Sequence, residues 1–169
     1  MNEEIVKRIE EISAEGRDEK TEDVPKTNWL VFSICSKKYA IQSSAVREII
    51  RDVAVYKLPF LPSYIEGVIN RRGDPFTVLN PIPLMESGNE TVPKEPLFLL
   101  LKRDDDQISL HISDILFFHE IEDTELHTIA NNDEDGLFLG TFDYKGEEIP
   151  ALNTDTFELI LQRDLGAAK

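Results

Sequence analysis

The chain nearly repeats itself, and this repeat constrains the fold more than any other feature. Residues 65–80 (IEGVINRRGDPFTVLN) align with residues 138–153 (FLGTFDYKGEEIPALN), with two glycines, a leucine and a terminal asparagine in common. An earlier pair, residues 39–46 (YAIQSSAV) and residues 108–115 (ISLHISDI), agrees at a similar offset. Two segments repeated in the same order indicate two copies of one small unit. The longer segment reads as strand, glycine-containing turn and strand, so the unit is a β structure.

The length of the repeat predicts how the two copies are arranged. A unit of about 70 residues buries too little surface to be comfortably stable alone. We therefore expect the copies to share one core within the 169 residues, of which 41% are apolar. Many short strands joined by regular turns are typical of small barrels. The continuously apolar run Leu97–Leu101 predicts a central strand that is buried on both sides.

Charge and cysteine content exclude several classes of partner. The chain carries 33 acidic and 18 basic residues, a formal net charge of −15, which repels nucleic acid and anionic membranes. No apolar run approaches the roughly 18–20 residues of a membrane span, so direct membrane insertion is not expected. The acidic N-terminus lacks a secretion signal. Cys35 is the only cysteine; we expect it to be buried and inert in a reducing, cytoplasmic compartment.

The two ends of the chain read differently from its middle. Residues 1–27 form an acidic tail, in which Glu3–Glu15 has a helical stripe of isoleucines and the rest is a polar linker. A helix this short is marginal in water, so a frayed tail and a short docking helix both remain open. Asn153–Arg163 predicts a closing helix with Phe157, Ile160 and Leu161 inward. Residues 164–169 are expected to form a flexible end.

Patterns that carry catalysis or metal binding are weak in this chain. It contains no phosphate-binding loop, dinucleotide glycine motif or nucleophile elbow. His111, His119 and His127 lack compact metal-ligand spacing, and His111 lies in a strand, where a structural role is expected. The loop beginning at Asn131 partly mimics an EF-hand, but Phe142 occupies the place of its bidentate glutamate. We expect no cofactor, no metal and no catalytic residue; a metal-binding or enzymatic β-barrel is the less favoured alternative.

The combined pattern resembles the CheW-type chemotaxis coupling proteins over about residues 28–163. The matching segments, in chain order, are residues 29–32 (WLVF), 38–41 (KYAI), 46–49 (VREI), 58–62 (LPFLP) and 65–73 (IEGVINRRG). The resemblance implies a mainly β fold of two intertwined five-stranded SH3-like barrels that share one core, with a C-terminal helix and an N-terminal helical tail. We expect the first barrel at about residues 28–82 and the second at about residues 96–163.

The resemblance also implies a function without catalysis. Proteins of this family are adaptors that join the cytoplasmic tips of methyl-accepting chemoreceptors to the regulatory domain of the histidine kinase CheA, which is similar in fold. The expected location is the receptor array beneath the inner membrane, where self-association in rings is left open. Two related alternatives also stay open: a coupling protein of a non-motility chemosensory pathway, and a stand-alone relative of the kinase regulatory domain.

Several positions match family positions tied to partner binding. Carried over residue by residue, these are Val46, Glu48, Gly67, Arg72 and Gly73. The glycines could instead serve backbone conformation or close packing, and Val46 could be core. We predict that Glu48 and Arg72 pair with each other and orient the receptor-binding groove. Arg71 stands where the family commonly has leucine, so we treat it as a specificity determinant.

The first copy departs from the family after its arginine–glycine turn. Thr77 replaces the usual proline and Asn80 the usual aspartate, whereas the second copy keeps a proline at Pro150. In the second copy, Leu110-His111 stands where the family often has a valine–aspartate pair. These departures agree with the fold and leave partner choice open.

Overall fold

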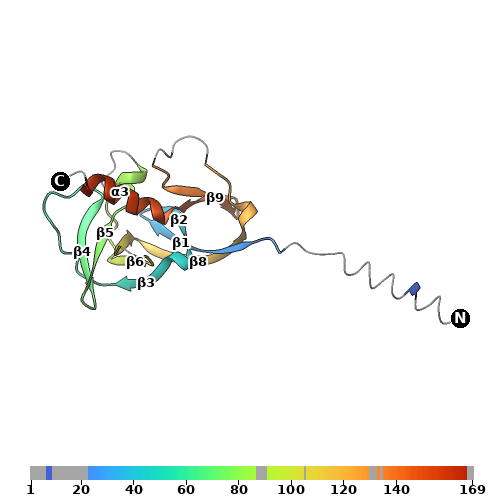
Figure 1. Ribbon diagram of the computed structural model, residues 1–169, viewed down its shortest axis with the longest axis horizontal. Helices are drawn as coiled ribbons and strands as arrows, with labels where there is room; N and C mark the ends of the chain where they lie inside the picture. The colour runs from blue at the N-terminus through green and yellow to red at the C-terminus, as the bar shows by residue number, and fades with distance from the viewer. Residues whose placement is uncertain are drawn as a thin grey trace.

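The structure, a computed structural model, describes residues 7–8, 23–86, 91–104, 106–129, 133 and 135–166. Of the helix expected over Glu3–Glu15 only residues 7–8 are described, and they are helical; in the loop that begins at Asn131, residues 131, 132 and 134 lie outside the described part. Within the folded part of Figure 1, β3, β4 and β5 lie toward the left, β8 and β9 toward the right, and α3 at the upper left. Among the described residues, no helix has the length and apolar character that a membrane span requires.

The elements follow the repeat closely. The first half contains β1 (Lys26–Ile34), β2 (Lys37–Gln42), the 3-10 turn η1 (Ser43–Ala45), β3 (Val46–Arg51), β4 (Ile65–Arg71), β5 (Asp74–Leu79) and the short helix α2 (Ile82–Met85). The second half contains β6 (Leu97–Leu101), β7 (Ile108–Ile112), β8 (Asp114–Glu122), the 3-10 turn η2 (Asp123–Glu125), β9 (Phe138–Tyr144), β10 (Glu147–Leu152) and α3 (Thr154–Gly166). The strand–turn–strand reading of both copies is confirmed.

The strands form two five-stranded sheets that exchange strands between the copies. One sheet, barrel A, has the order β8-β1-β2-β10-β9, and the other, barrel B, has the order β3-β6-β7-β5-β4. Since β1 to β5 correspond to β6 to β10, each sheet takes two strands from one copy and three from the other. The predicted division into barrels at about residues 28–82 and 96–163 is therefore wrong. The exchange arises because β2 pairs in parallel with β10, and β7 pairs in parallel with β5.

Three apolar clusters fill the molecule, one between the sheets and one inside each barrel. On β6, Leu97, Leu99 and Leu101 face the central cluster, while Phe98 and Leu100 face the interior of barrel B. The prediction that this strand is buried on both sides is confirmed. β1 divides in the same way, with Trp29 and Val31 inside barrel A. From α3, Phe157 and Ile160 close the central cluster as predicted, and Leu161 is half-buried.

In each copy a β-bulge changes which apolar cluster the inward side chains of one strand face, from the central cluster to the interior of a barrel. The bulge residue of β4 is Glu66, so Ile65 faces the central cluster whereas Ile69 faces the interior of barrel B. In β9 the pairing shifts at the equivalent place, between Phe138 and Gly140. A bulge adds one residue to a strand, which reverses the face its side chains take. Both isoleucines therefore point inward, but into two different cores.

The C-terminal helix is longer than the sequence suggests. It begins at Thr154 and continues to Gly166, so the first residues of the expected flexible end, 164–166, are helical. Residues 167–169 lie outside the described residues. Asn153 precedes the helix, and its side chain accepts a hydrogen bond from the backbone of Asp155. In this copy the repeat's terminal asparagine therefore caps a helix; in the other copy Asn80 accepts from the N–H of Ile82 at the start of α2, whose N-cap residue is Pro81.

Candidate partner-binding site

The two edge strands of barrel B meet at a seam that an ion pair bridges. Arg71, at the end of β4, donates from Nε to Glu48 Oε2 on β3 at 3.0 Å, and its Nη2 donates to Glu48 Oε1. Two parallel bonds of this kind fix the guanidinium in the plane of the carboxylate. The hydrogen bonds from Arg71 hold the pKa of Glu48 below its usual value, and they raise the pKa of Arg71. Both side chains are about one-third exposed, so the pair remains accessible to a partner.

The predicted pairing of Glu48 with Arg72 is wrong, because the turn places Arg72 elsewhere. Arg72 and Gly73 have φ values of 54° and 93° and form the two-residue turn between β4 and β5. Positive φ at both central residues is the geometry of a type I′ hairpin. Arg71 is the last strand residue and reaches across the seam, whereas Arg72 sits exposed at the tip. In the described part of the chain no hydrogen bond or ion pair reaches Arg72, although its charge helps to lower the pKa of Glu48.

Gly67 has a structural role: it allows another segment of backbone to approach closely. The sequence left this role and partner binding both open. A Cβ at Gly67 would lie 2.2 Å from the carbonyl oxygen of Tyr56. Tyr56 crosses β4 here and exchanges two backbone hydrogen bonds with Val68, of 2.8 and 2.9 Å. The missing side chain therefore lets the chain after β3 close over barrel B. A direct contact of Gly67 or Gly73 with a partner stays a prediction.

Two neighbours in β3 complete the seam. Val46 is half-buried and packs against the central cluster, so it is partly core. Arg47 is the bulge residue of β3, and its guanidinium lies 5.6 Å from the centroid of the Phe76 ring. A guanidinium at this distance over an aromatic face is attracted by the ring quadrupole. Sequence reasoning missed Arg47, because nothing in the local pattern marks it as a bulge.

The loop between β3 and β4 presents apolar side chains to solvent. Tyr56 is 64% exposed, Leu58 is 52% exposed and Phe60 is fully exposed. Phe60 also has a φ of 60°, a left-handed conformation in which a bulky residue is an outlier. Strained, exposed aromatic residues are features of interaction sites. Sequence reasoning matched this loop to the family without singling out Phe60, although a large aromatic between two prolines was the available signal.

The region around the seam and the loop is locally basic in an acidic protein. Residues 46–73 contain five basic and three acidic side chains, whereas the whole chain has a net charge of −15. One of the three carboxylates, Glu66, is largely buried and paired with His111. A partner with acidic side chains around an apolar contact would complement this surface.

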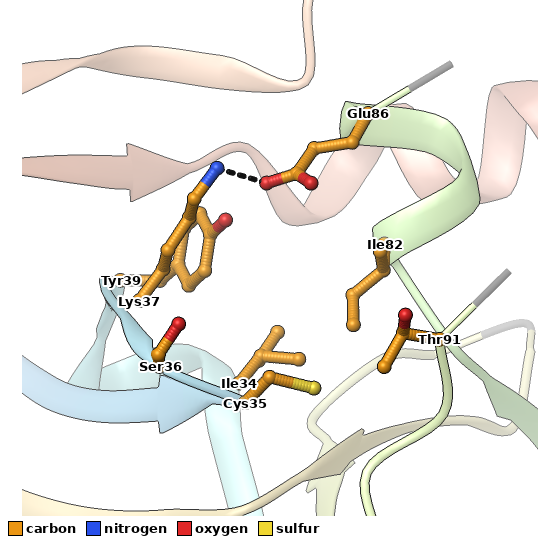
Figure 2. A pocket seen from close by; sticks show the side chains of 8 residues that line it. All are labelled: Ile34, Cys35, Ser36, Lys37, Tyr39, Ile82, Glu86 and Thr91. Carbon is orange, nitrogen blue, oxygen red and sulfur yellow. Dashed lines mark hydrogen bonds and ion pairs between the residues drawn. The ribbon is translucent and has the colours of Figure 1, made fainter. Parts of the chain in front are cut away.

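A surface cavity of about 240 Å³ lies between the β1–β2 turn and α2 (Figure 2). Cys35 lines this cavity. The expectation that Cys35 is buried is wrong, because the residue is exposed at the turn after β1. Partial desolvation of the sulfur at this turn, followed by the nearby charges of Glu95 and Glu86, raises the pKa of the thiol. An ion pair between Lys37 and Glu86 spans one side of the cavity.

The described residues hold no group of three or more His, Cys, Asp or Glu side chains that could bind a metal ion. The polar groups at the barrel B seam are instead arranged as a surface: a bidentate ion pair, an exposed arginine at a hairpin tip and an apolar loop. This arrangement suits the recognition of another protein.

Comparison with known proteins agrees with this reading. The chemotaxis protein CheW of Helicobacter pylori is 24% identical over 138 residues, which cover 80% of this chain and 82% of that protein. The crystal structure of the scaffolding protein TtCheW from Thermoanaerobacter tengcongensis superposes with a TM-score of 0.67 at 21% identity, over 76% of this chain and 90% of that one. At that identity the likeness concerns the fold, which is two SH3-like barrels. Residues 28–160 match the model of the CheW-like domain, and the chain belongs to this family.

Proposed function

We propose that the chain is a non-enzymatic adaptor that couples chemoreceptor tips to the regulatory domain of a CheA-type histidine kinase. Membership of the CheW-like family supports a chemotaxis adaptor in general. The observation that carries the specific proposal is the partly exposed, bidentate Glu48–Arg71 pair beside the exposed Arg72. The adaptor would act at receptor arrays beneath the inner membrane.

The receptor tip is assigned to the seam of barrel B. The resemblance to coupling proteins ties Val46, Glu48 and Arg72 to partner binding; the first two lie on the edge strand β3, and Arg72 lies at the hairpin tip after β4. Arg71 fixes the Glu48 carboxylate, and Arg72 presents five donors to acidic groups on the partner. Coupling proteins commonly have leucine at the position of Arg71, and a leucine could not form this ion pair. The seam of this chain is therefore more polar than is common in the family. We expect Arg71 to decide which receptors are accepted.

The kinase regulatory domain is assigned to the loop that presents Phe60. This loop ends where β4 begins, whereas the hairpin tip follows the end of β4 at Arg71. Seven extended residues separate the two surfaces by about 20 Å. One molecule can therefore hold both partners together, which raises their effective concentration for each other. An aromatic anchor such as Phe60 is the kind of residue that dominates a modest interface.

Titration calorimetry with matched variants tests each assignment. For the receptor-tip fragment, Arg72→Ala is compared with Lys145→Ala, since Lys145 occupies the equivalent turn position in barrel A. We expect at least about tenfold weaker binding for the first variant only, a change of about 1.4 kcal/mol. For the kinase domain, Phe60→Ser is compared with Leu159→Ser, an exposed apolar residue on α3. Equal losses within either pair would contradict that assignment, and no binding by the wild-type protein would contradict the proposed function.

A further inference from the structure

A histidine–glutamate pair is buried in barrel B, where barrel A has uncharged residues. The side chains of His111 on β7 and Glu66 on β4 are only 8% and 13% exposed. His111 Nδ1 lies 2.8 and 2.9 Å from the two carboxylate oxygens of Glu66, and its Nε2 lies 2.6 Å from the carbonyl oxygen of Glu95. The repeat places Gln42 and Leu139 at the equivalent positions of barrel A.

Both ring nitrogens of His111 therefore face hydrogen-bond acceptors. A neutral imidazole carries one N–H, so either tautomer would set a nitrogen lone pair against an oxygen. If Nδ1 lost its proton, the lone pair would face the Glu66 carboxylate; if Nε2 lost its proton, it would face the carbonyl of Glu95. The doubly protonated ring satisfies both contacts, and the Glu66 carboxylate balances its charge.

The two acceptors hold both ends of the loop that carries Phe60. Glu66 is the bulge residue next to Gly67, against which Tyr56 packs, so it sets the position of the Tyr56–Val68 bridge. Glu95 precedes Pro96, whose carbonyl accepts a hydrogen bond of 3.0 Å from the N–H of Asp52 at the start of the loop.

We infer that His111, Glu66 and the Glu95 carbonyl form a proton-dependent clamp that fixes the loop of residues 52–64. With His111 protonated, the clamp joins the β4 bulge to the segment before β6. Loss of the proton breaks one of its two connections and loosens the loop. The inference concerns the loop itself, so its test uses the protein alone and does not depend on any partner.

The electrostatic surroundings of the ring agree with the geometry. Burial alone would lower the pKa of His111, but the hydrogen bond and charge of Glu66, with those of Glu95, raise it above its ordinary value. Glu66 and Glu95 are the charged groups that face the ring from β4 and from the segment before β6, and the tilted ring of Phe98 on β6 has its centroid 4.8 Å from that of His111. The contribution of the clamp is therefore complete below about pH 6.5 and is lost as the pH rises through the folded pKa.

Amide hydrogen exchange across a pH series, corrected for intrinsic rates, tests the clamp with an internal control. The Tyr56–Val68 bridge of barrel B has an equivalent in barrel A, the His127–Thr141 bridge. Above the folded pKa we expect protection of the Tyr56 and Val68 amides to fall about tenfold further than protection of the His127 and Thr141 amides, the size expected when a hydrogen bond to a charged group is lost. Parallel changes at both bridges would overturn the inference.

Two variants separate a proton-dependent clamp from a packing contact. Glu66→Gln can donate its amide N–H to a neutral Nδ1, while Nε2 still donates to Glu95, so this variant should stay closed and lose the pH response. His111→Gln places the residue of barrel A at this position and should also lose the response. ¹⁵N spectra of the wild-type ring should show both nitrogens protonated at pH 6. A neutral ring at that pH, or an unchanged pH response in Glu66→Gln, would overturn the inference.

Discussion

Barrels A and B are built from equivalent strands, yet they close their seams with opposite chemistry. In barrel B the seam is the Glu48–Arg71 ion pair. The repeat places Phe117 and Tyr144 at the equivalent positions of barrel A, where the two rings stack with their centroids 4.4 Å apart. The pairing register supports the equivalence, since the bulge residues Arg47 and Leu116 also correspond.

The difference between the seams shows how one scaffold can use one seam for folding stability and the equivalent seam for recognition of a partner. Stacked, partly buried aromatic rings contribute through apolar burial and ring contacts. An exposed ion pair contributes little to folding, because water solvates the charges nearly as well. The aromatic seam therefore holds barrel A together, whereas the ionic seam leaves barrel B a polar surface that a partner can use.

The interiors of the barrels show a compensating difference. In barrel B, Ile69 pairs with Phe76 across β4 and β5, and in barrel A, Phe142 pairs with Ile149 across β9 and β10. The large and small residues have exchanged strands. Such volume-conserving exchanges are the ones that packed cores tolerate best, so both barrels keep filled interiors with different sequences.

The largest expected effect concerns the glycines over which each barrel closes. Gly67→Ala would place a Cβ 2.2 Å from the Tyr56 oxygen, and Gly140→Ala would place one 2.5 Å from the His127 oxygen. Gly67 also has a φ of 147°. We expect urea denaturation to show losses of about 3 kcal/mol for Gly67→Ala and about 2 kcal/mol for Gly140→Ala. Gly73→Ala, with open space around its Cβ, is the control and should cost about 1 kcal/mol. A loss at Gly67 no greater than this control would contradict the closure described for barrel B.

The next effect separates the two seams directly. Phe117→Ala removes a ring that packs against the core of barrel A, and we expect a loss of about 2 kcal/mol because the site is only partly buried. Arg71→Ala, at the equivalent seam of barrel B, should change the free energy of unfolding much less. Denaturation of both variants in parallel checks the contrast. A larger loss for Arg71→Ala would show that the ionic seam is structural.

The smallest effect concerns the only tryptophan. Trp29 lies inside barrel A at the position equivalent to Phe98 in barrel B, and its indole Nε1 is buried without a hydrogen-bond partner in the described structure. Trp29→Phe removes that unsatisfied donor together with some apolar area. We therefore expect the free energy of unfolding, followed by circular dichroism, to change by less than about 1 kcal/mol. A loss of about 3 kcal/mol would mean that the two interiors are not interchangeable at this position.

The sequence predicted local structure better than pairing. The repeat located both hairpins, and the continuously apolar run Leu97–Leu101 located a strand buried on both faces. It could not show which copy each strand pairs with, because two similar units present the same apolar pattern to either sheet. The strand exchange between β2 and β10 is therefore visible only in the assembled molecule.

The site was predictable at the level of the segment rather than the side chain. Residues 46–73 were identified, but the partner of Glu48 depended on where β4 ends and the turn begins. A shift of one residue decides between Arg71 and Arg72, since neighbouring strand residues point to opposite faces. The exposure of Phe60 likewise depends on a left-handed backbone conformation that local preference disfavours.

One variant tests the central claim most directly, by giving barrel B the seam of barrel A. Glu48→Phe combined with Arg71→Tyr replaces the ion pair with the residues found at Phe117 and Tyr144. Its melting temperature and its titration with a receptor-tip fragment are measured beside those of the wild-type protein. We predict an unchanged or higher melting temperature together with loss of binding. Unchanged binding would contradict the claim that the ionic seam of barrel B is the surface that recognises the receptor.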